Sequence, residues 1–308
     1  MRHIFIINPA AGRTDSSEKL FREIERLCKL RGIEPLIWIS EYPGYEYEMT
    51  KRMSELFSGE KIRIYCVGGS GTLNSALNAV DNFENVELAS IPIGLSNDIL
   101  KSYGETKKLF KKPENIIDGR VDMLDIGEVN GVRFIDFINF GLKSALLNRY
   151  RILKVLAYIN PVLYYAPGII FDLFASKCHD YEITVDGADY SGRYSFVTLM
   201  NGKCMGGAVI PIPDAKPNDG VFDILMVKKA NPIKKCMLFA KLLQGKLHEN
   251  SSDVIFLKAR EMQVARRDGK PLLLNCDGEK YLSESGCADI SFSTDKLSFA
   301  VPEKSELC

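Results

Sequence analysis

The sequence has no excess of charge of either sign. Its 308 residues include 40 Lys and Arg and 40 Asp and Glu, which gives a formal net charge of zero. Binding to nucleic acid normally requires a basic excess that neutralises phosphates, so nucleic acid is not expected as a partner. Repeats, charge blocks and low-complexity stretches are also lacking. Because 46% of the residues are hydrophobic, the chain can bury a core, and its length suits two domains.

Cysteine and histidine do not form a recognisable framework. The eight cysteines include no CxxC pair, and the three histidines have no metal-like spacing to them. Reduced thiols in a cytoplasmic protein are therefore the expectation. The opening stretch MRHIFIINPAAG ends its apolar run in Asn-Pro and does not continue as the core of a signal peptide.

Long uninterrupted hydrophobic runs are absent as well. Residues 155–175 approach the length of a membrane span, but proline, glycine, asparagine and aspartate interrupt them. An isolated helix exposed to lipid tolerates such breaks badly. We expect broken helices that pack on a domain or line an apolar groove.

What the first 125 residues do contain is an alternation of strands and helices. The hydrophobic pattern predicts strands at 3–7, 35–40, 63–67 and 86–94, and helices at about 16–31, 45–57, after the glycine turn within 68–80, and from 95 onward. This order predicts an α/β domain with a Rossmann-like parallel sheet. Right-handed crossovers would bring the loops that follow the strands to one edge of the sheet, where open α/β sheets bind ligands.

Beyond residue 125 the pattern changes to short alternating segments. Turn dipeptides such as Asn130-Gly131 and Asp186-Gly187 separate them. We expect a mainly antiparallel β-sandwich domain over residues 126–294, interrupted by helices near 150–177 and 231–246. The segment 295–304 is expected to complete the first domain as a further strand.

Three loops at the expected sheet edge carry glycine: Asn8–Gly12, Gly68–Thr72 and Pro92–Asp98. Backbone N–H groups of such loops, together with the positive end of a following helix dipole, can hold phosphate oxygens. A glycine turn before a helix is by itself a weak signal, because such turns are also common for steric reasons. The three loops together favour a phosphate site more strongly than any one of them.

Five motifs in a fixed order resemble the bacterial diacylglycerol kinase and sphingosine kinase family of lipid kinases. They are NPAAG at 8–12, GGSGT at 68–72, PIGLSND at 92–98, PDAKPNDG at 213–220 and DGE at 277–279. The resemblance extends over nearly the whole chain. It implies a kinase that transfers the γ-phosphoryl group of ATP, with Mg²⁺, to a hydroxyl of diacylglycerol or a related lipid. It also implies transient contact with a membrane surface, and a homodimer is compatible with it.

The resemblance assigns roles to individual residues. Glu279 would be the general base that takes the proton from the attacking hydroxyl, and Asp277 would orient or assist it. Taken alone, DGE would be a hairpin turn. The nucleotide would be bound by residues of the loops at the sheet edge: Asn8, Ser40, Gly68, Gly69, Ser70, Gly71, Thr72, Asn74, Gly94, Asn97 and Asp98.

Magnesium would be held in two places. In the first domain the resemblance implies the carboxylates of Asp98 and Asp125, although Asp98 is also a natural helix cap. In the second domain it implies a structural site made by the Asp219 carboxylate and the backbone carbonyls of Lys216 and Val221. Oxygen ligands from one tight loop suit this hard cation.

The chain departs from the family pattern within the nucleotide loops. Ser70 stands where most members have aspartate, Ser75 where glutamate is common and Leu95 where threonine is common. The serine at 70 removes a negative charge that would attract magnesium. We therefore expect phosphate binding by backbone amides with a weakly held metal.

Two alternatives remain beside an active lipid kinase. One is a non-catalytic relative of the same fold that binds lipid or nucleotide. The other is an enzyme like NAD kinase, which shares a similar glycine loop. The DGE motif and the apolar stretch 155–175, which suits a lipid tail, favour the lipid kinase over the NAD kinase.

Overall fold

The structure is a computed structural model that describes residues 1–12, 16–94, 96–141, 178–207, 209–247 and 252–308. The chain forms two compact units, an N-terminal one of residues 1–126 and 294–308 and a C-terminal one of residues 127–293. The sequence boundaries at 125 and 294 differ from these limits by one residue. Leu95 and the apolar stretch 155–175 lie outside the described residues.

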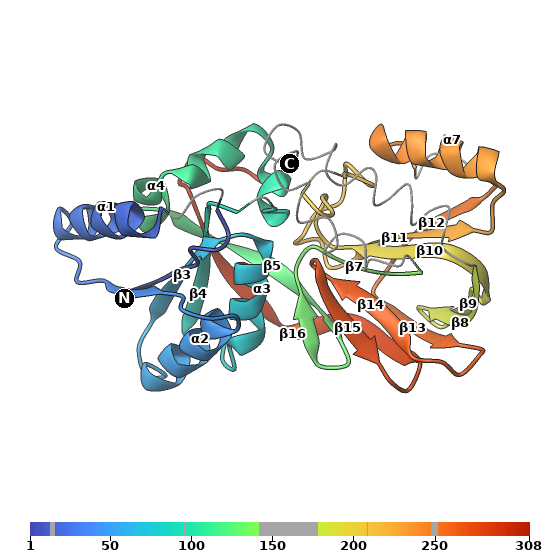
Figure 1. Cartoon of the computed structure of the whole chain (residues 1–308), viewed down its shortest axis with the longest axis horizontal. Coiled ribbons are helices and arrows are strands. Elements are labelled where there is room, and N and C mark those ends of the chain that lie inside the picture. The colour runs from blue at the N-terminus through green and yellow to red at the C-terminus, as the bar shows by residue number, and fades with distance from the viewer. Residues whose placement is uncertain (13–15, 95, 142–177, 208, 248–251) are drawn as a thin grey trace. The chain divides into compact units, whose positions relative to one another are not determined.

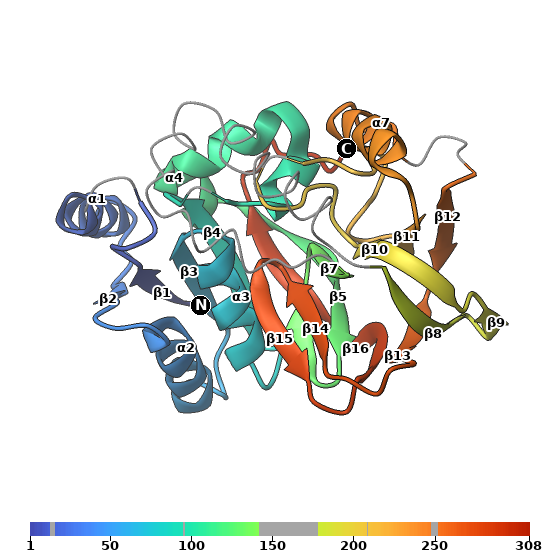
Figure 2. The same cartoon turned by 45° about the vertical axis from the view of Figure 1, so that its right-hand side comes forward.

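The N-terminal unit alternates strands and helices (Figure 1). Its elements are β1 (Arg2–Ile7), α1 (Ser17–Lys29), β2 (Leu36–Ile39), α2 (Tyr45–Leu56), β3 (Ile62–Gly68), α3 (Ser70–Ala79), β4 (Val86–Pro92), η1 (Ile99–Lys111) and α4 (Pro113–Ile117). The strands lie in the order β2-β1-β3-β4, and every pair is parallel. Figure 2 shows α2 and α3 side by side, with α3 packed on β3 and β4. The predicted α/β fold with a parallel sheet is confirmed.

The fourth helix differs from the expectation. It begins at Ile99 instead of at about residue 95, and η1 is a 3-10 helix. Gly104, with φ 50° and ψ −127°, breaks it in the middle. Because only glycine adopts such a backbone conformation readily, the local sequence ends the regular helix there.

Two long strands have residues in both units. They are β5 (Arg120–Val129) and β16 (Cys287–Val301). In the N-terminal unit, residues Ser298–Ala300 of β16 pair in parallel with Glu87–Ala89 of β4. The final strand therefore extends the parallel sheet, at the place where the sequence predicts a strand from 295 to 304.

The C-terminal unit is mainly antiparallel (Figure 1). Besides β5 and β16 it contains β6 (Val132–Phe134), β7 (Phe137–Phe140), β8 (His179–Val185), β9 (Ala188–Asp189), β10 (Gly192–Met200), β11 (Phe222–Lys228), α7 (Pro232–Leu243), β12 (Val254–Ala259), β13 (Glu261–Arg266), β14 (Leu272–Cys276) and β15 (Glu279–Ser283). One apolar core lies among the strands. A second core lies beneath α7, where Leu238 and Leu242 pack with Leu225 and Val227 of β11. The predicted β-rich second domain is confirmed.

Three hairpins of this unit have two-residue loops with positive φ at both positions. They are Asn130-Gly131, Asp186-Gly187 and Asp277-Gly278. Such turns match the right-handed twist of the flanking strands and favour Asn-Gly and Asp-Gly. The DGE motif therefore forms a hairpin turn, with Glu279 as the first residue of β15.

Candidate functional site

The glycine loop of the N-terminal unit packs directly against the next loop of the sheet edge. Gly68 accepts N–H bonds from Ile93 and Gly94, both at 3.0 Å, and the Ser70 N–H donates to the Ser96 carbonyl at 2.8 Å. A Cβ atom on Gly94 would lie 2.7 Å from the Gly69 Cα. A side chain at 94 is therefore excluded, and at Gly69 a Cβ atom would lie 3.0 Å from the Ser96 carbonyl oxygen, so the motif has a steric function whatever else it does.

The first turn of α3 also supplies anion-binding groups. Leu73 donates the first bond of the helix, to the Gly69 carbonyl at 3.2 Å, so no carbonyl within the helix can accept from the N–H groups of Gly71 and Thr72. The Thr72 hydroxyl accepts from Asn8 Nδ2 at 3.2 Å, which joins the first loop to this turn. This turn has the backbone geometry and dipole that favour a phosphate.

The hydroxyl of Ser70 has a defined partner. Its Oγ accepts the backbone N–H of Asp98 at 3.1 Å. The carboxylate of Asp98 is buried and accepts from the Ser96 hydroxyl at 3.0 Å. Among the other predicted nucleotide residues, Asn97 Nδ2 donates to the Gly94 carbonyl at 3.1 Å, and Ser40 follows β2 at the same sheet edge. Asn74 is buried on α3.

Asp125 already has a positively charged neighbour. Its carboxylate is 6% exposed, and Oδ1 lies 2.7 Å from Nζ of Lys296 on the adjacent strand β16. The sequence did not single out Lys296, because it is 171 residues away. Only the pairing of β5 with β16 identifies it.

Asp277 is a structural clamp in the C-terminal unit. Its buried carboxylate accepts three backbone N–H groups: Oδ2 from Ile135 at 2.8 Å, and Oδ1 from Asp136 and Phe137 at 2.9 Å each. These bonds fix the hairpin turn to the segment between β6 and β7. The side chain of Glu279, two residues on, is exposed. The two acids therefore differ in environment, and a proton acceptor needs the accessible one.

A lysine of strand β12 lies beside the predicted structural metal loop. Nζ of Lys258 lies 3.6 Å from Asp219 Oδ2 and 3.2 Å from Asp223 Oδ1. Asp223 and Lys258 face each other in the register of β11 and β12. Burial raises the pKa of Asp223, while the Lys258 ammonium opposes the shift. An ammonium here supplies positive charge beside Asp219, so it competes with a divalent cation for this loop.

The described residues contain no group of three or more His, Cys, Asp or Glu side chains that could hold a metal. Magnesium in nucleotide sites usually uses only one or two carboxylates, with waters and phosphates as its other ligands. Asp98 is a buried carboxylate of the kind that such an ion uses. Asp125 and Asp219 each already lie beside a lysine ammonium, Lys296 and Lys258 respectively, which competes with a divalent cation at both places.

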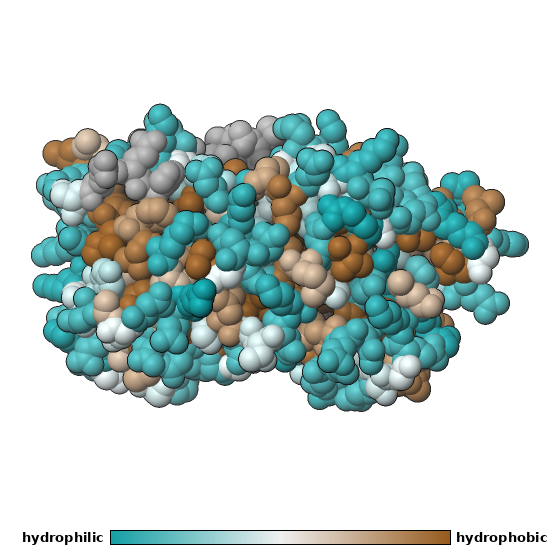
Figure 3. Space-filling model, turned by 180° about the vertical axis from the view of Figure 1, so that it is seen from behind, coloured by the Kyte–Doolittle hydropathy of each residue, from teal (hydrophilic) through white to brown (hydrophobic). Residues whose placement is uncertain are grey.

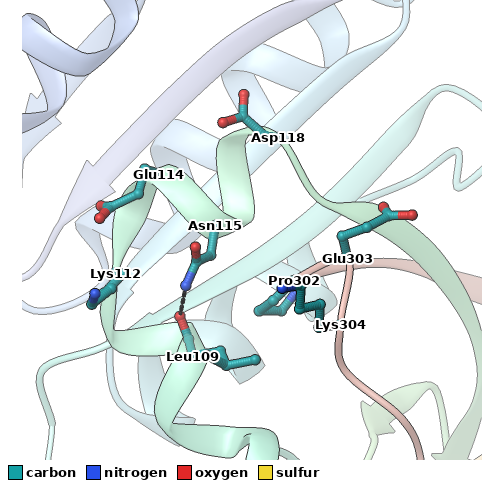
Figure 4. Close-up of a pocket in the computed structure, with 8 residues that line it drawn as sticks. All are labelled: Leu109, Lys112, Glu114, Asn115, Asp118, Pro302, Glu303 and Lys304. Atoms are coloured by element: carbon teal, nitrogen blue, oxygen red, sulfur yellow. Dashed lines mark hydrogen bonds between the residues drawn. The ribbon is translucent and has the colours of Figure 1, made fainter.

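A pocket of the N-terminal unit lies elsewhere (Figure 4). It is lined by Leu109, Lys112, Glu114, Asn115, Asp118, Pro302, Glu303 and Lys304. None of the predicted site residues lines it, and its charges are of both signs. It is therefore not assigned to the nucleotide. In the described part of the chain, no helix is long and apolar enough to cross a membrane.

Comparison with known proteins agrees with this arrangement. Residues 2–129 match the diacylglycerol kinase catalytic domain, and residues 146–288 match the YegS C-terminal NAD kinase beta sandwich-like domain. The diacylglycerol kinase of Bacillus subtilis is 29% identical over 279 residues, which cover 89% of this chain and 88% of that protein. A diacylglycerol kinase of Staphylococcus epidermidis is 28% identical over 280 residues, 89% of this chain and 84% of that protein.

Solved structures show the same fold. The crystal structure of a diacylglycerol kinase from Bacillus anthracis is 20% identical with a TM-score of 0.70, covering 97% of this chain and 96% of that one. A second structure from the same organism is 22% identical with a TM-score of 0.74, at the same coverage. With its catalytic domain followed by its β-sandwich domain, this chain belongs to the diacylglycerol kinase family of lipid kinases.

Proposed function

We propose that this protein phosphorylates a hydroxyl of diacylglycerol, or of a lipid that presents a similar hydroxyl, with ATP as the phosphoryl donor. The observation that carries the proposal is the intact glycine loop within a segment that matches the diacylglycerol kinase catalytic domain. Phosphoryl transfer depends mainly on positioning and charge stabilisation, and this loop supplies both through its backbone.

The nucleotide phosphates would bind at the N–H groups of Gly71 and Thr72, with Asn8 fixing the Thr72 hydroxyl. Magnesium, when bound, would neutralise charge on these phosphates, and Asp98 and Asp125 would hold it. Ser70 contributes a hydroxyl in place of a carboxylate, so its attraction for the metal is weaker. Lys296 further reduces the negative charge at Asp125.

Glu279 would take the proton of the lipid hydroxyl. Its exposure lets an acceptor approach, and its place at the start of β15 fixes the backbone from which it projects. Asp277 would act as a positioning residue, because its carboxylate accepts three backbone N–H groups of its own unit.

The test is transfer of labelled phosphate from ATP to dioleoylglycerol in mixed micelles with magnesium. We expect labelled phosphatidic acid, and Glu279→Gln should abolish most of it. Glu284→Gln, which changes an exposed glutamate beyond the other end of β15, is the matched control and should leave transfer unchanged.

Parallel reactions would offer phosphatidylglycerol, sphingosine and NAD as acceptors. Labelled NAD without labelled lipid would replace this proposal with the NAD kinase alternative. Binding of ATP without transfer to any acceptor would support the non-catalytic relative.

A further inference from the structure

Helix α7 carries a strip of apolar side chains on its outer face. Ile233 and Met237 are 75% and 61% exposed, and Ala240 is exposed as well. Their spacing of four and three residues places them on one side of the helix. Leu238 and Leu242, on another side, are buried in the core beneath it. The helix is therefore anchored by one face and presents a second apolar face to the outside.

The surroundings of this strip are basic. The segment 228–247 contains six lysines and no aspartate or glutamate. Lys234 and Lys241 fall along one edge of the strip at helical spacing. Nζ of Lys234 lies 2.9 Å from Asp253, so part of its charge is compensated. Since the whole chain has a formal net charge of zero, this is a local concentration of positive charge.

Among the described residues, no other helix has two large exposed hydrophobic side chains three or four positions apart. On the face shown in Figure 3, hydrophobic residues gather in the left part of the view and are scattered among hydrophilic ones elsewhere. In the N-terminal unit, Leu56 is 65% exposed, but it is the last residue of α2. That helix has three glutamates and only two basic residues, Lys51 and Arg52. Single exposed apolar side chains are ordinary on protein surfaces, whereas an apolar strip beside lysines is typical of helices that lie on membranes.

We propose that the outer face of α7, centred on Ile233 and Met237, docks onto an anionic lipid surface. The side chains of Ile233 and Met237 would enter the boundary between headgroups and acyl chains, and the lysines would contact anionic headgroups. This inference rests on the proposed function, since a kinase of membrane lipids must reach the bilayer. One short strip gives weak, reversible binding, which suits an enzyme that has to leave the surface.

The experiment is sedimentation with vesicles of phosphatidylcholine containing about a quarter phosphatidylglycerol, without ATP or diacylglycerol. The double variant Ile233→Ser/Met237→Ser should bind the vesicles at least about tenfold more weakly, because it lacks two apolar side chains that would be buried in the lipid. Lys241→Gln should weaken binding roughly fivefold, and added salt should weaken the wild type. Leu56→Ser, an exposed leucine on a helix of the other unit, should bind as the wild type does.

Unchanged binding of the double variant would overturn the proposal. The proposal would also be overturned if light scattering showed a dimeric wild type and a monomeric double variant with the same vesicle binding. The apolar strip would in that case be the contact between two copies of the chain. Thermal unfolding of the double variant should match the wild type, since both side chains are exposed. Phosphorylation of short-chain, water-soluble diacylglycerol should also be retained. If the double variant loses vesicle binding but neither it nor the wild type phosphorylates any lipid, the proposed function is refuted and the proposed lipid-docking surface of α7 remains supported.

Discussion

The two units form their candidate sites by different means. In the N-terminal unit, backbone contacts between Gly68 and Gly94 and between Ser70 and Ser96 assemble the loops. In the C-terminal unit, the carboxylate of Asp277 fixes the hairpin through three N–H bonds. Glycine makes the first arrangement possible by its lack of a side chain, and a buried charge makes the second one stable. Side-chain substitutions should therefore affect the C-terminal unit more strongly.

The comparison also applies to the acids expected to bind metal. Asp125 in one unit and Asp219 in the other each lie near a lysine of a neighbouring strand, Lys296 and Lys258 respectively. The pair at Asp125 involves one acid. The C-terminal cluster adds Asp223, which is buried and faces Lys258 across the sheet. Removal of the lysine should consequently cost more in the C-terminal unit.

The largest effect is expected for Glu279→Gln. Loss of a positioned general base should lower turnover by roughly 10²- to 10⁴-fold. Thermal stability and ATP affinity should stay unchanged, because Glu279 is exposed and lies in the C-terminal unit. Steady-state kinetics and calorimetric ATP titration are the measurements. Full turnover in this variant would mean that DGE has no function beyond its turn.

The next largest effect is expected for Asp277→Asn. The amide keeps one acceptor oxygen but places an NH₂ group against a backbone N–H, so the free energy of unfolding should fall by about 3 kcal/mol. Urea unfolding measures it. Asp186→Asn is the control, since Asp186 has the same turn position and also accepts backbone N–H groups, from Arg260 and Glu261, but is exposed, so water can replace these bonds. Equal losses in the two variants would contradict the clamp.

Lys258→Met should destabilise the protein by about 2 kcal/mol at neutral pH, between the values for exposed and buried pairs. Burial raises the pKa of Asp223, and the Lys258 ammonium opposes this rise. The pKa of Asp223 should therefore rise further in this variant. The destabilisation caused by Lys258→Met is absent at a pH where Asp223 is protonated in the folded protein. It appears as the pH rises through the raised pKa of Asp223 in the folded state. The destabilisation should therefore be smaller at pH 4 than at pH 7.

Magnesium adds a second readout to this variant. Without the ammonium, Asp219 and Asp223 are left to attract a cation, so magnesium should raise the melting temperature of Lys258→Met and leave the wild type unchanged. Lys234→Met, which removes the more exposed pair with Asp253, should not become magnesium-dependent. A wild type whose melting temperature falls on chelation would restore the metal site implied by the sequence.

The smallest effect is expected for Ser70→Asp. A carboxylate here can still accept the Asp98 N–H, and its position in the first turn of α3 favours negative charge. Its attraction for magnesium should be about 1 kcal/mol stronger at the dielectric of water. The magnesium concentration needed for half-maximal binding should therefore be roughly fivefold lower. Titration of magnesium into the nucleotide complex tests this. Ser75→Asp adds the same charge further along α3 and is the control; an equal shift there would refute a local effect.

Much of the fold and some of the site follow from the sequence itself. Hydrophobic periodicity located the strands of the parallel sheet, and Asn-Gly and Asp-Gly dipeptides located the hairpins, because both are local properties of the chain. The order of motifs identified the family. The break at Gly104 was missed, since its positive φ leaves no distinct mark in a stretch that also suits a regular helix.

Only the tertiary structure decided the partners of the acids. The sequence marked Asp125, Asp219 and Asp277 by motif alone and could not show what each would contact. Sheet pairing brings Lys296 to Asp125 across 171 residues, and places Lys258 opposite Asp223. Asp277 likewise finds its N–H donors some 140 residues away. A motif specifies which groups are available, but the charge that a buried carboxylate meets depends on strands that are distant in sequence and adjacent in space.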